Sequence, residues 1–96
     1  MTEEKTLEWR SDFHKALSNP VRLKIVDFLI DGEQCQCDIF PYMGLSQSTV
    51  SAYLTQLVKA DILIVRRDGT RKLYNIKDVK LKKMIEQIRN LANARI

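Results

Sequence analysis

Histidine, cysteine, glycine and proline are all scarce in this sequence. The 96 residues include one histidine, two cysteines, three glycines and two prolines. Two cysteines are too few for a disulfide framework, and Cys35 and Cys37 are separated by only one residue, which is short for a relaxed disulfide. We therefore expect both to be free thiols. No base, glycine-rich phosphate loop or carboxylate pair accompanies them, so an enzyme is the least favoured class of protein.

Long hydrophobic runs are also missing. No apolar stretch approaches the length that crosses a bilayer, and the opening residues Thr2, Glu3, Glu4 and Lys5 argue against a signal peptide. We expect a cytoplasmic protein without membrane contact. A chain of this length is expected to form a single domain over residues 1–96, and so small a domain buries only a modest core of its own. A second subunit would add buried surface.

Charge is unevenly placed along the chain. Residues 1–45 contain five Lys or Arg against eight Asp or Glu, a net charge of −3. Residues 59–83 contain nine against three, a net charge of +6. A cationic segment of this kind is typical of a surface that contacts nucleic acid.

Apolar residues at helical spacing predict a helix over residues 6–17 and a second one that begins at Pro20 and ends at Gly32. Pro41 cannot lie deep inside a helix because it has no N–H group. We therefore expect Asp38 to cap a short third helix, with Pro41 in its first turn. The two cysteines would then precede that helix.

Ser46 is a good N-cap for a fourth helix that runs to about Lys59. Beyond it, residues 62–67 and 71–76 are rich in residues that favour strands. The intervening Asp-Gly-Thr is a typical turn, so the pair predicts a β-hairpin.

The last helix is predicted over residues 78–95, with Asp78 as its cap. Its apolar residues form one stripe, which is too long for so small a domain to cover. We therefore expect this stripe to form a dimer interface. The residues assigned to it are Leu81, Met84, Ile85, Ile88 and Leu91.

The order of these elements is that of a winged helix-turn-helix, a mainly α fold with five helices and a two-stranded β-hairpin as the wing. The exposed side of the fourth helix is short, polar and uncharged, which suits hydrogen bonding to base edges. The basic hairpin could hold phosphates or enter the minor groove. The residues predicted to contact DNA are Gln47, Ser48, Thr49, Ser51 and Tyr53 on the helix, and Arg66, Arg67, Arg71 and Lys72 on the hairpin.

Two alternatives remain open for this polar and basic surface. The hairpin charges by themselves could serve only to solvate a strand edge and prevent aggregation. A winged-helix module that binds protein and never touches DNA would also tolerate an uncharged fourth helix. The basic hairpin argues against such a module, and a steep salt dependence of DNA binding would decide between the two.

Four stretches of the sequence resemble the ArsR/SmtB family of winged-helix repressors. They are ALSNPVRLKIVDFL from Ala16, CQCDI from Cys35, GLSQSTVSAYLTQLVKADIL from Gly44 and RRDGTRKLYNI from Arg66. Together they cover most of the chain.

The resemblance implies a homodimer formed by the first and last helices, a recognition helix that begins at Ser46, and repression relieved by an inducer. A two-fold dimer would place two recognition helices about one turn of DNA apart, which predicts an inverted-repeat operator. The sequence departs from the family where Tyr53 replaces a frequent His and Asp61 replaces a frequent Gly. Asp can still adopt the left-handed conformation that Gly would ease.

Family members that sense arsenite, cadmium or lead often carry a Cys-x-Cys before the recognition motif, and Cys35-Gln36-Cys37 resembles that site. A third cysteine commonly follows in arsenite sensors, but Phe40 occupies that position here. In an extended segment both sulfurs could hold one thiophilic metal or metalloid ion, with Asp38 or His14 as a possible third ligand.

Oxidation of the pair is a second route to the same response, because a helix N-terminus lowers the pKa of nearby thiols. No resident cofactor is required under either route. The alternatives are two cysteines without a ligand and a regulator that has no small inducer.

Overall fold

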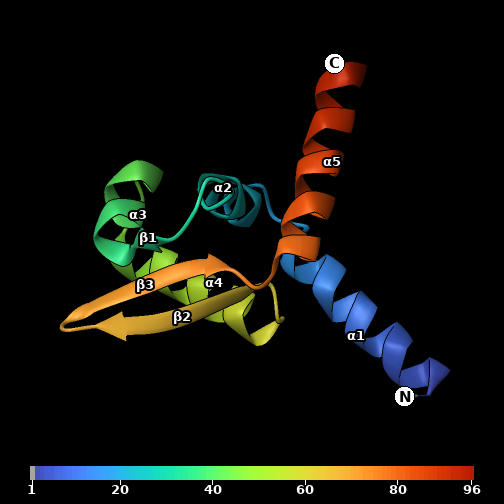
Figure 1. Cartoon of the computed structure of the whole chain (residues 1–96), viewed down its shortest axis with the longest axis horizontal. Coiled ribbons are helices and arrows are strands. Elements are labelled where there is room, and N and C mark those ends of the chain that lie inside the picture. The colour runs from blue at the N-terminus through green and yellow to red at the C-terminus, as the bar shows by residue number, and fades with distance from the viewer. Residues whose placement is uncertain (1) are drawn as a thin grey trace.

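The computed structural model describes residues 2–96, which fold into five helices and three strands (Figure 1). The predicted architecture of five helices with a hairpin wing is confirmed. No helix within these residues is long and apolar enough to span a membrane. The elements are α1 (Glu3–Ala16), α2 (Pro20–Phe28), β1 (Gln34–Cys35), α3 (Gln36–Met43), α4 (Gln47–Lys59), β2 (Leu63–Asp68), β3 (Arg71–Ile76) and α5 (Val79–Arg95).

Three of the helices begin where the sequence predicts. Asn19 Oδ1 accepts hydrogen bonds from the N–H groups of the first turn of α2, and Pro20 occupies the first helical position. Ser46 Oγ accepts from Thr49 N–H at the start of α4, and Asp78 caps α5 in the same way. These local bonds fix where each helix starts, because the first-turn N–H groups have no partner inside the helix.

The predicted start of α3 is wrong. The helix begins at Gln36, two residues before Asp38, and Cys35 is the N-cap, with its Sγ accepting a hydrogen bond from Cys37 N–H at 3.1 Å. Pro41 therefore lies inside the helix. In a helix this short, the missing N–H removes only the bond to the carbonyl four residues earlier, and Gly44 ends the helix in the left-handed conformation.

The wing belongs to a three-stranded antiparallel sheet in the order β1-β3-β2. The hairpin pairs Leu63 with Ile76 at its base and Asp68 with Arg71 at its tip. The short strand β1, which the sequence did not predict, pairs Cys35 with Leu73 on the other side of β3. The cysteine segment and the wing are therefore joined through the backbone of one strand.

One hydrophobic core holds these elements together. Its fully buried side chains come from α2, α3, α4 and β2, and Ile85 adds a contact from α5. Figure 1 shows α1 and α5 extending away from this body on the side opposite the wing. The fully buried residues are Ile25, Val26, Leu29, Ile39, Val50, Leu54, Leu57, Ile62 and Leu63.

The joint between α4 and β2 contains Asp61 in the left-handed conformation, with φ of 66°. The expectation that Asp adopts this conformation where Gly is frequent is confirmed. Asp61 also forms an ion pair with Lys77, at 2.9 Å between Oδ1 and Nζ. On the backbone, Lys77 N–H donates to Ile62 O at 2.9 Å. The joint is thus fixed to the end of β3 by two separate bonds.

Candidate nucleic-acid interface

The exposed side of α4 is polar and carries no charge along its first two turns. We name Gln47, Ser48, Ser51, Ala52 and Thr55 the α4 polar face; all five residues are exposed. The opposite side of the helix is buried in the core. The Thr55 hydroxyl already donates to Ser51 O at 2.9 Å, which leaves the amide and hydroxyl groups of the first turn as the outward hydrogen-bonding groups.

The structure separates two of the predicted contact residues from this face. Thr49 is half-buried, and its hydroxyl accepts a hydrogen bond from Ser46 Oγ at 2.8 Å as part of the helix cap. Tyr53 points about 200° away from Ser51 around the helix and packs against the core. The guanidinium of Arg22 lies over the Tyr53 ring, 5.2 Å from its centroid. Base contact by Thr49 and Tyr53 stays a prediction.

The four basic residues of the hairpin divide between the two faces of the sheet. Directly opposed residues of an antiparallel pair share a face, and successive residues alternate. Arg67 lies opposite Lys72, on the same face as Tyr74 and therefore toward α4. Arg66 and Arg71 lie on the other face, which also carries Leu73.

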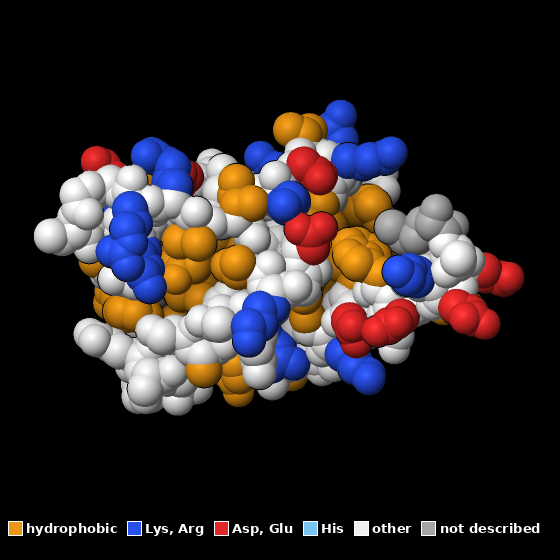
Figure 2. All heavy atoms as spheres, turned by 90° about the horizontal axis from the view of Figure 1, so that it is seen from below, with side chains coloured by type: hydrophobic (Ala, Val, Ile, Leu, Met, Phe, Trp, Pro, Cys, Tyr) orange, Lys and Arg blue, Asp and Glu red, His pale blue; other side chains and the backbone are white. Residues whose placement is uncertain are grey.

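A groove of about 540 Å³ runs between α4 and the wing. Its floor is apolar, and its rim carries the cations of Lys59, Arg67 and Lys72. Figure 2 shows basic side chains at the wing end of the molecule and acidic ones at the α1 end. Burial raises the pKa of the Tyr74 hydroxyl, so this group remains a neutral donor at physiological pH. We name this the wing groove, and its lining residues are Thr55, Val58, Lys59, Val65, Arg66, Arg67, Lys72 and Tyr74.

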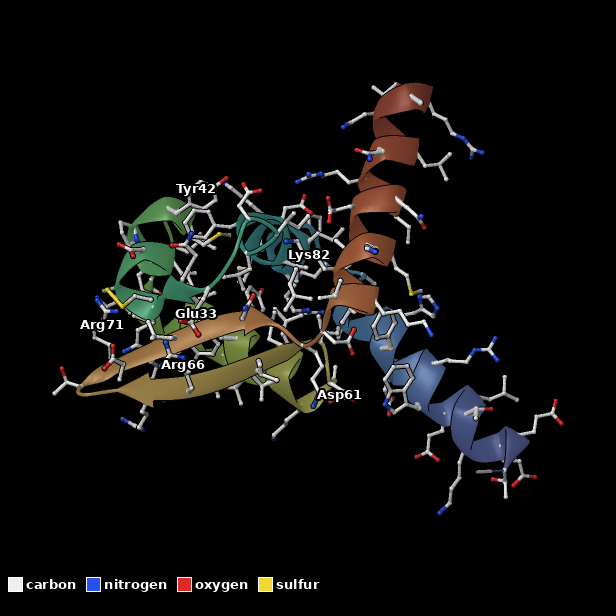
Figure 3. All side chains as sticks on the ribbon, in the orientation of Figure 1. Glu33, Tyr42, Asp61, Arg66, Arg71 and Lys82 are labelled. Carbon is white, nitrogen blue, oxygen red and sulfur yellow. A yellow bond between two sulfur atoms is a disulfide. The ribbon has the colours of Figure 1, made fainter. Side chains whose placement is uncertain are left out.

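Arg66 is held by a carboxylate that the sequence did not identify. Its Nε and Nη2 each donate to one oxygen of Glu33 at 2.8 Å, which is a bidentate pair (Figure 3). The two residues are 33 positions apart, and Glu33 comes just before β1. No local pattern in the sequence brings them together, because the contact depends on the pairing of β1 with β3.

The expectation of two free thiols is wrong, because Cys35 and Cys37 are joined by a disulfide. Cys35 lies in β1 with an extended backbone and Cys37 in the first turn of α3. This change of direction brings the Cα atoms to 5.1 Å, within the range of about 4.4–6.8 Å found for disulfides. Cys35 is buried, whereas Cys37 is exposed.

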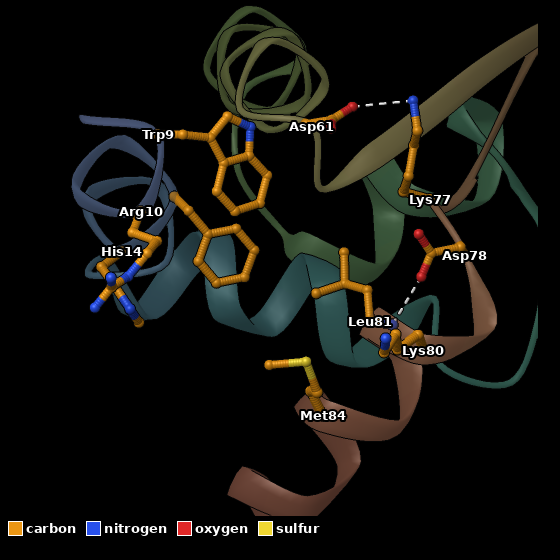
Figure 4. Close-up of a pocket in the computed structure, with 10 residues that line it drawn as sticks. Trp9, Arg10, His14, Asp61, Lys77, Asp78, Lys80, Leu81 and Met84 are labelled. Atoms are coloured by element: carbon orange, nitrogen blue, oxygen red, sulfur yellow. Dashed lines mark hydrogen bonds and ion pairs between the residues drawn. The ribbon is translucent and has the colours of Figure 1, made fainter. Parts of the chain in front are cut away.

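The possible third ligands do not gather around this pair. Within residues 2–96, no group of three or more His, Cys, Asp or Glu side chains is placed to hold a metal ion. His14 lies instead on α1, beside a cavity between α1 and α5 (Figure 4). The two sulfurs would be free to hold a metal or metalloid ion only after reduction of the disulfide.

The cavity between α1 and α5 has a volume of about 420 Å³ and an aromatic and aliphatic wall (Figure 4). Trp9 and Phe13 stack at 5.4 Å between ring centroids on the α1 side. Leu81 and Met84 line it from α5. The cavity is thus a continuation of the exposed apolar surface of α5.

The predicted interface stripe of α5 has two parts. Ile85 is buried in the subunit's own core, and Leu81 packs against that core. Met84, Ile88 and Leu91 are exposed, Ile88 by 66%. The exposed part continues onto α1 through Trp9, which is also exposed. The role of all five α5 residues in a dimer stays a prediction.

Comparison with known proteins identifies the family. Residues 19–65 match the family described as "Bacterial regulatory protein, arsR family". The "Probable mercury resistance operon repressor" of Streptomyces lividans is 34% identical over 80 residues, which cover 83% of this chain and 64% of that protein. This chain thus spans slightly less than two thirds of that repressor. The "Arsenical resistance operon repressor" of Staphylococcus aureus is also 34% identical, over 79 residues that cover 82% of this chain and 75% of that protein.

Solved structures agree with the sequence relatives. The homodimeric winged helix-turn-helix DNA-binding domain of Mb0332 from Mycobacterium bovis superposes with a TM-score of 0.88. The two sequences are 29% identical, and the match covers 97% of this chain and 88% of the other. The chain therefore belongs to the ArsR family of bacterial regulatory proteins, which are DNA-binding transcription regulators with a winged helix-turn-helix fold.

Proposed function

We propose that this chain is a dimeric repressor that reads duplex DNA with the α4 polar face and holds the DNA backbone with the wing groove. The observation that carries this proposal is the position of an uncharged polar helix face beside a groove with a cationic rim. Amide and hydroxyl groups exchange hydrogen bonds with base edges, whereas lysine and arginine neutralise phosphates. The α4 polar face would therefore contact bases, and the wing groove would bind the phosphate backbone.

Base reading is assigned to the first turns of α4. Gln47, Ser48 and Ser51 are exposed and make no contact with the core. A recognition helix contacts bases mainly through its N-terminal residues, and these three occupy that position. Thr49 and Tyr53 take part less directly, through the cap and the packing of the helix.

Phosphate binding is assigned first to Lys59, Arg67 and Lys72. All three line the wing groove, so one DNA strand beside α4 would pass close to each of them. Contacts of this kind are independent of sequence and give the steep salt dependence of DNA binding. Arg71 and Arg66 lie on the other face of the sheet and remain candidates for a second phosphate or the minor groove.

Dimerisation is assigned to the exposed stripe of α5 together with α1. Met84, Ile88 and Leu91 form a row of large apolar side chains at helical spacing without cover in the monomer. The homodimeric Mycobacterium bovis neighbour supports this assignment. A two-fold axis through these helices would separate two α4 helices by about 34 Å, one turn of DNA, and would favour an inverted-repeat operator.

Regulation is assigned to the Cys35–Cys37 pair, with oxidation as the favoured signal. A peroxide takes two electrons and two protons from the two thiols, which gives the disulfide and, from hydrogen peroxide, two molecules of water. The pair caps α3 and belongs to β1, so a change at the sulfurs acts directly on the helix-turn-helix and on β3. Relatives described as mercury and arsenical resistance repressors support a thiophilic ion as the alternative signal for the reduced pair.

Fluorescence anisotropy of a labelled duplex from the region upstream of the protein's own coding sequence tests these assignments. The protein is titrated after reduction, after treatment with hydrogen peroxide, and, in the reduced state, with cadmium, mercuric ion or arsenite. We expect tight binding in the reduced state and a loss of at least tenfold on oxidation. The variant that combines Cys35→Ser with Cys37→Ser should bind like the reduced protein under all conditions.

Each outcome separates the parts of the proposal. If the affinity for DNA does not depend on salt concentration, or if the protein binds no duplex, the DNA-binding function is rejected and a protein-interaction module is favoured. Tight binding that changes with an ion but not with peroxide would replace oxidation by ion sensing. Tight binding that is indifferent to every addition would leave a repressor whose cysteines serve only the structure of α3.

A further inference from the structure

The Arg66 guanidinium is already engaged in the geometry with which arginine binds a phosphate. Both of its bonds to Glu33 are 2.8 Å long and run in parallel to the two oxygens of one carboxylate. A phosphodiester would accept from the same two N–H groups in the same way. One guanidinium edge cannot serve both anions at once.

The sheet register explains why the Arg66 side chain points toward Glu33 rather than outward. Arg66 lies opposite Leu73, and Leu73 lies opposite Cys35, so these three side chains share one face across β2, β3 and β1. Glu33 precedes Cys35 by two residues and shares that face. The Arg66 side chain therefore runs back across β3 to reach Glu33, as Figure 3 shows.

The wing cations on the opposite face of the sheet, which faces α4, are not restrained in this manner. Within residues 2–96, neither Arg67 nor Lys72 forms an ion pair with a carboxylate. The Arg71–Asp68 pair is longer, at 3.9 Å, and it joins neighbouring residues of the hairpin tip. The Glu33 pair is the one contact among these that ties a wing cation to a distant segment.

The pair is also open to competition. The side chain of Arg66 is 61% exposed and that of Glu33 is 32% exposed. Exposed ion pairs contribute little stability and exchange readily. The hydrogen bond from Arg66 holds the pKa of Glu33 below its usual range, so the carboxylate stays charged at neutral pH.

We propose that Glu33 is a built-in competitor for DNA phosphate, which occupies Arg66 and thereby lowers the affinity of the protein for DNA. The proposal rests on the proposed DNA-binding function. A phosphate that takes the Nε–Nη2 edge of Arg66 must displace the Glu33 carboxylate, which then lies close to the DNA. A phosphate that takes the Nη1 side instead meets a cation whose charge Glu33 already offsets. Glu33 therefore weakens binding to every sequence, because the contact it opposes is to the backbone and not to a base.

Four variants test this proposal by anisotropy with one labelled duplex of mixed sequence, over a series of salt concentrations and in one fixed redox state. Glu33→Gln removes the competing charge, and Asp31→Asn is the matched control, an equal charge change two residues away on an exposed turn. Arg66→Gln and the double variant Glu33→Gln with Arg66→Gln complete a cycle. Thermal unfolding of each variant checks that it is folded.

We expect Glu33→Gln to tighten DNA binding by roughly three- to tenfold at low salt. The slope of log affinity against log salt concentration should also become steeper by about 0.9 for each Arg66 that binds a phosphate. Asp31→Asn should change affinity less than about twofold. Arg66→Gln alone should have a small effect, and in the double variant the gain from Glu33→Gln should fall to the size of the Asp31→Asn effect.

Two results would overturn the proposal. One is an equal gain from Glu33→Gln and Asp31→Asn, which would reduce the effect to general charge. The other is a gain from Glu33→Gln that keeps its full size when Arg66 is replaced. If the unchanged protein binds no duplex at all, the DNA-binding function itself fails, which is a different result from either of these.

Discussion

The two ends of the molecule present opposite surfaces, although they share one core. The end formed by α1 and α5 exposes large apolar side chains, including Trp9, Met84 and Ile88. The end formed by α4 and the wing exposes hydroxyl and amide groups beside cations. An exposed apolar row favours a partner that excludes water, whereas a polar surface with a basic rim favours a charged and hydrated partner. The contrast is the basis for proposing a second copy at one end and DNA at the other.

The largest effect is expected at the apolar end. Ile88→Asp places a charge in the exposed α5 row and should convert the dimer to a monomer. Operator affinity should then fall by about 100-fold or more, because two α4 helices are no longer linked. Val79→Asp is the matched control, since Val79 is also 66% exposed but lies on the opposite side of α5.

Light scattering and anisotropy on the same samples check this prediction. If the protein without substitutions is a monomer at micromolar concentration, the apolar end is not a dimer interface and its contrast with the DNA-binding end loses its explanation. If Ile88→Asp and Val79→Asp dissociate the dimer equally, the interface does not lie on the exposed row of α5 that includes Ile88.

A smaller effect is expected when the α4 polar face is altered. Gln47→Ala combined with Ser48→Ala should weaken binding to the operator by about 10- to 100-fold, since one good bidentate base contact, which the Gln47 amide can make, contributes about 1–3 kcal/mol of discrimination. Binding to a duplex of unrelated sequence should stay unchanged. The measurement is anisotropy with both duplexes, and an equal loss on both would show that these residues do not read bases.

The wing should show the reverse pattern. Arg67→Gln or Lys72→Gln should weaken binding to all duplexes by about three- to tenfold and reduce the slope of log affinity against log salt by about 0.9 for each phosphate that is no longer bound. Lys83→Gln on α5 is a control with the same change of charge at the other end of the molecule. If the loss of affinity depends on the sequence of the duplex, the wing contacts bases as well as phosphates.

The smallest effect concerns the core that joins the two ends. Burial raises the pKa of Asp27 on α2, and Arg89 opposes this shift only in part. The folded protein therefore prefers the neutral acid, so the ionised form reduces stability at neutral pH and the penalty disappears below the ordinary pKa of aspartate. Asp27→Asn should raise the melting temperature by about 1–2 °C at pH 7 and leave it unchanged near pH 3. A gain of equal size at both pH values would contradict this cause.

The parts of the molecule that were predictable from sequence are those specified by local signals. Asn19, Ser46 and Asp78 cap helices through bonds to residues two or three positions away, and Asp-Gly-Thr turns the hairpin. The direction of the α4 polar face followed from helical periodicity alone. The apolar stripe of the last helix predicted a dimer interface, and family resemblance added the first helix to it.

The parts that were missed depend on pairing between distant segments. Strand β1 has two residues, too few for a recognisable alternation, and exists only because β3 lies beside it. The Glu33–Arg66 pair follows from that contact. The disulfide was missed for another reason: the spacing of two residues was taken as too short for a relaxed disulfide, whereas the turn of the chain from β1 into α3 places the two Cα atoms 5.1 Å apart.

The fixed joint at Asp61 determines how the protein and its operator can adapt to each other. The left-handed backbone at Asp61 sets the direction in which the chain leaves α4, and the hydrogen bond from Lys77 N–H to Ile62 O holds the two ends of the wing together at its base. If the wing enters the minor groove as proposed, a duplex whose groove is too wide or too narrow would have to change shape to fit the wing. Sequences that bend or narrow easily at that step would then be preferred even where no side chain touches a base. A protein with a stiff wing would in this way bind more tightly to operator sequences that deform easily.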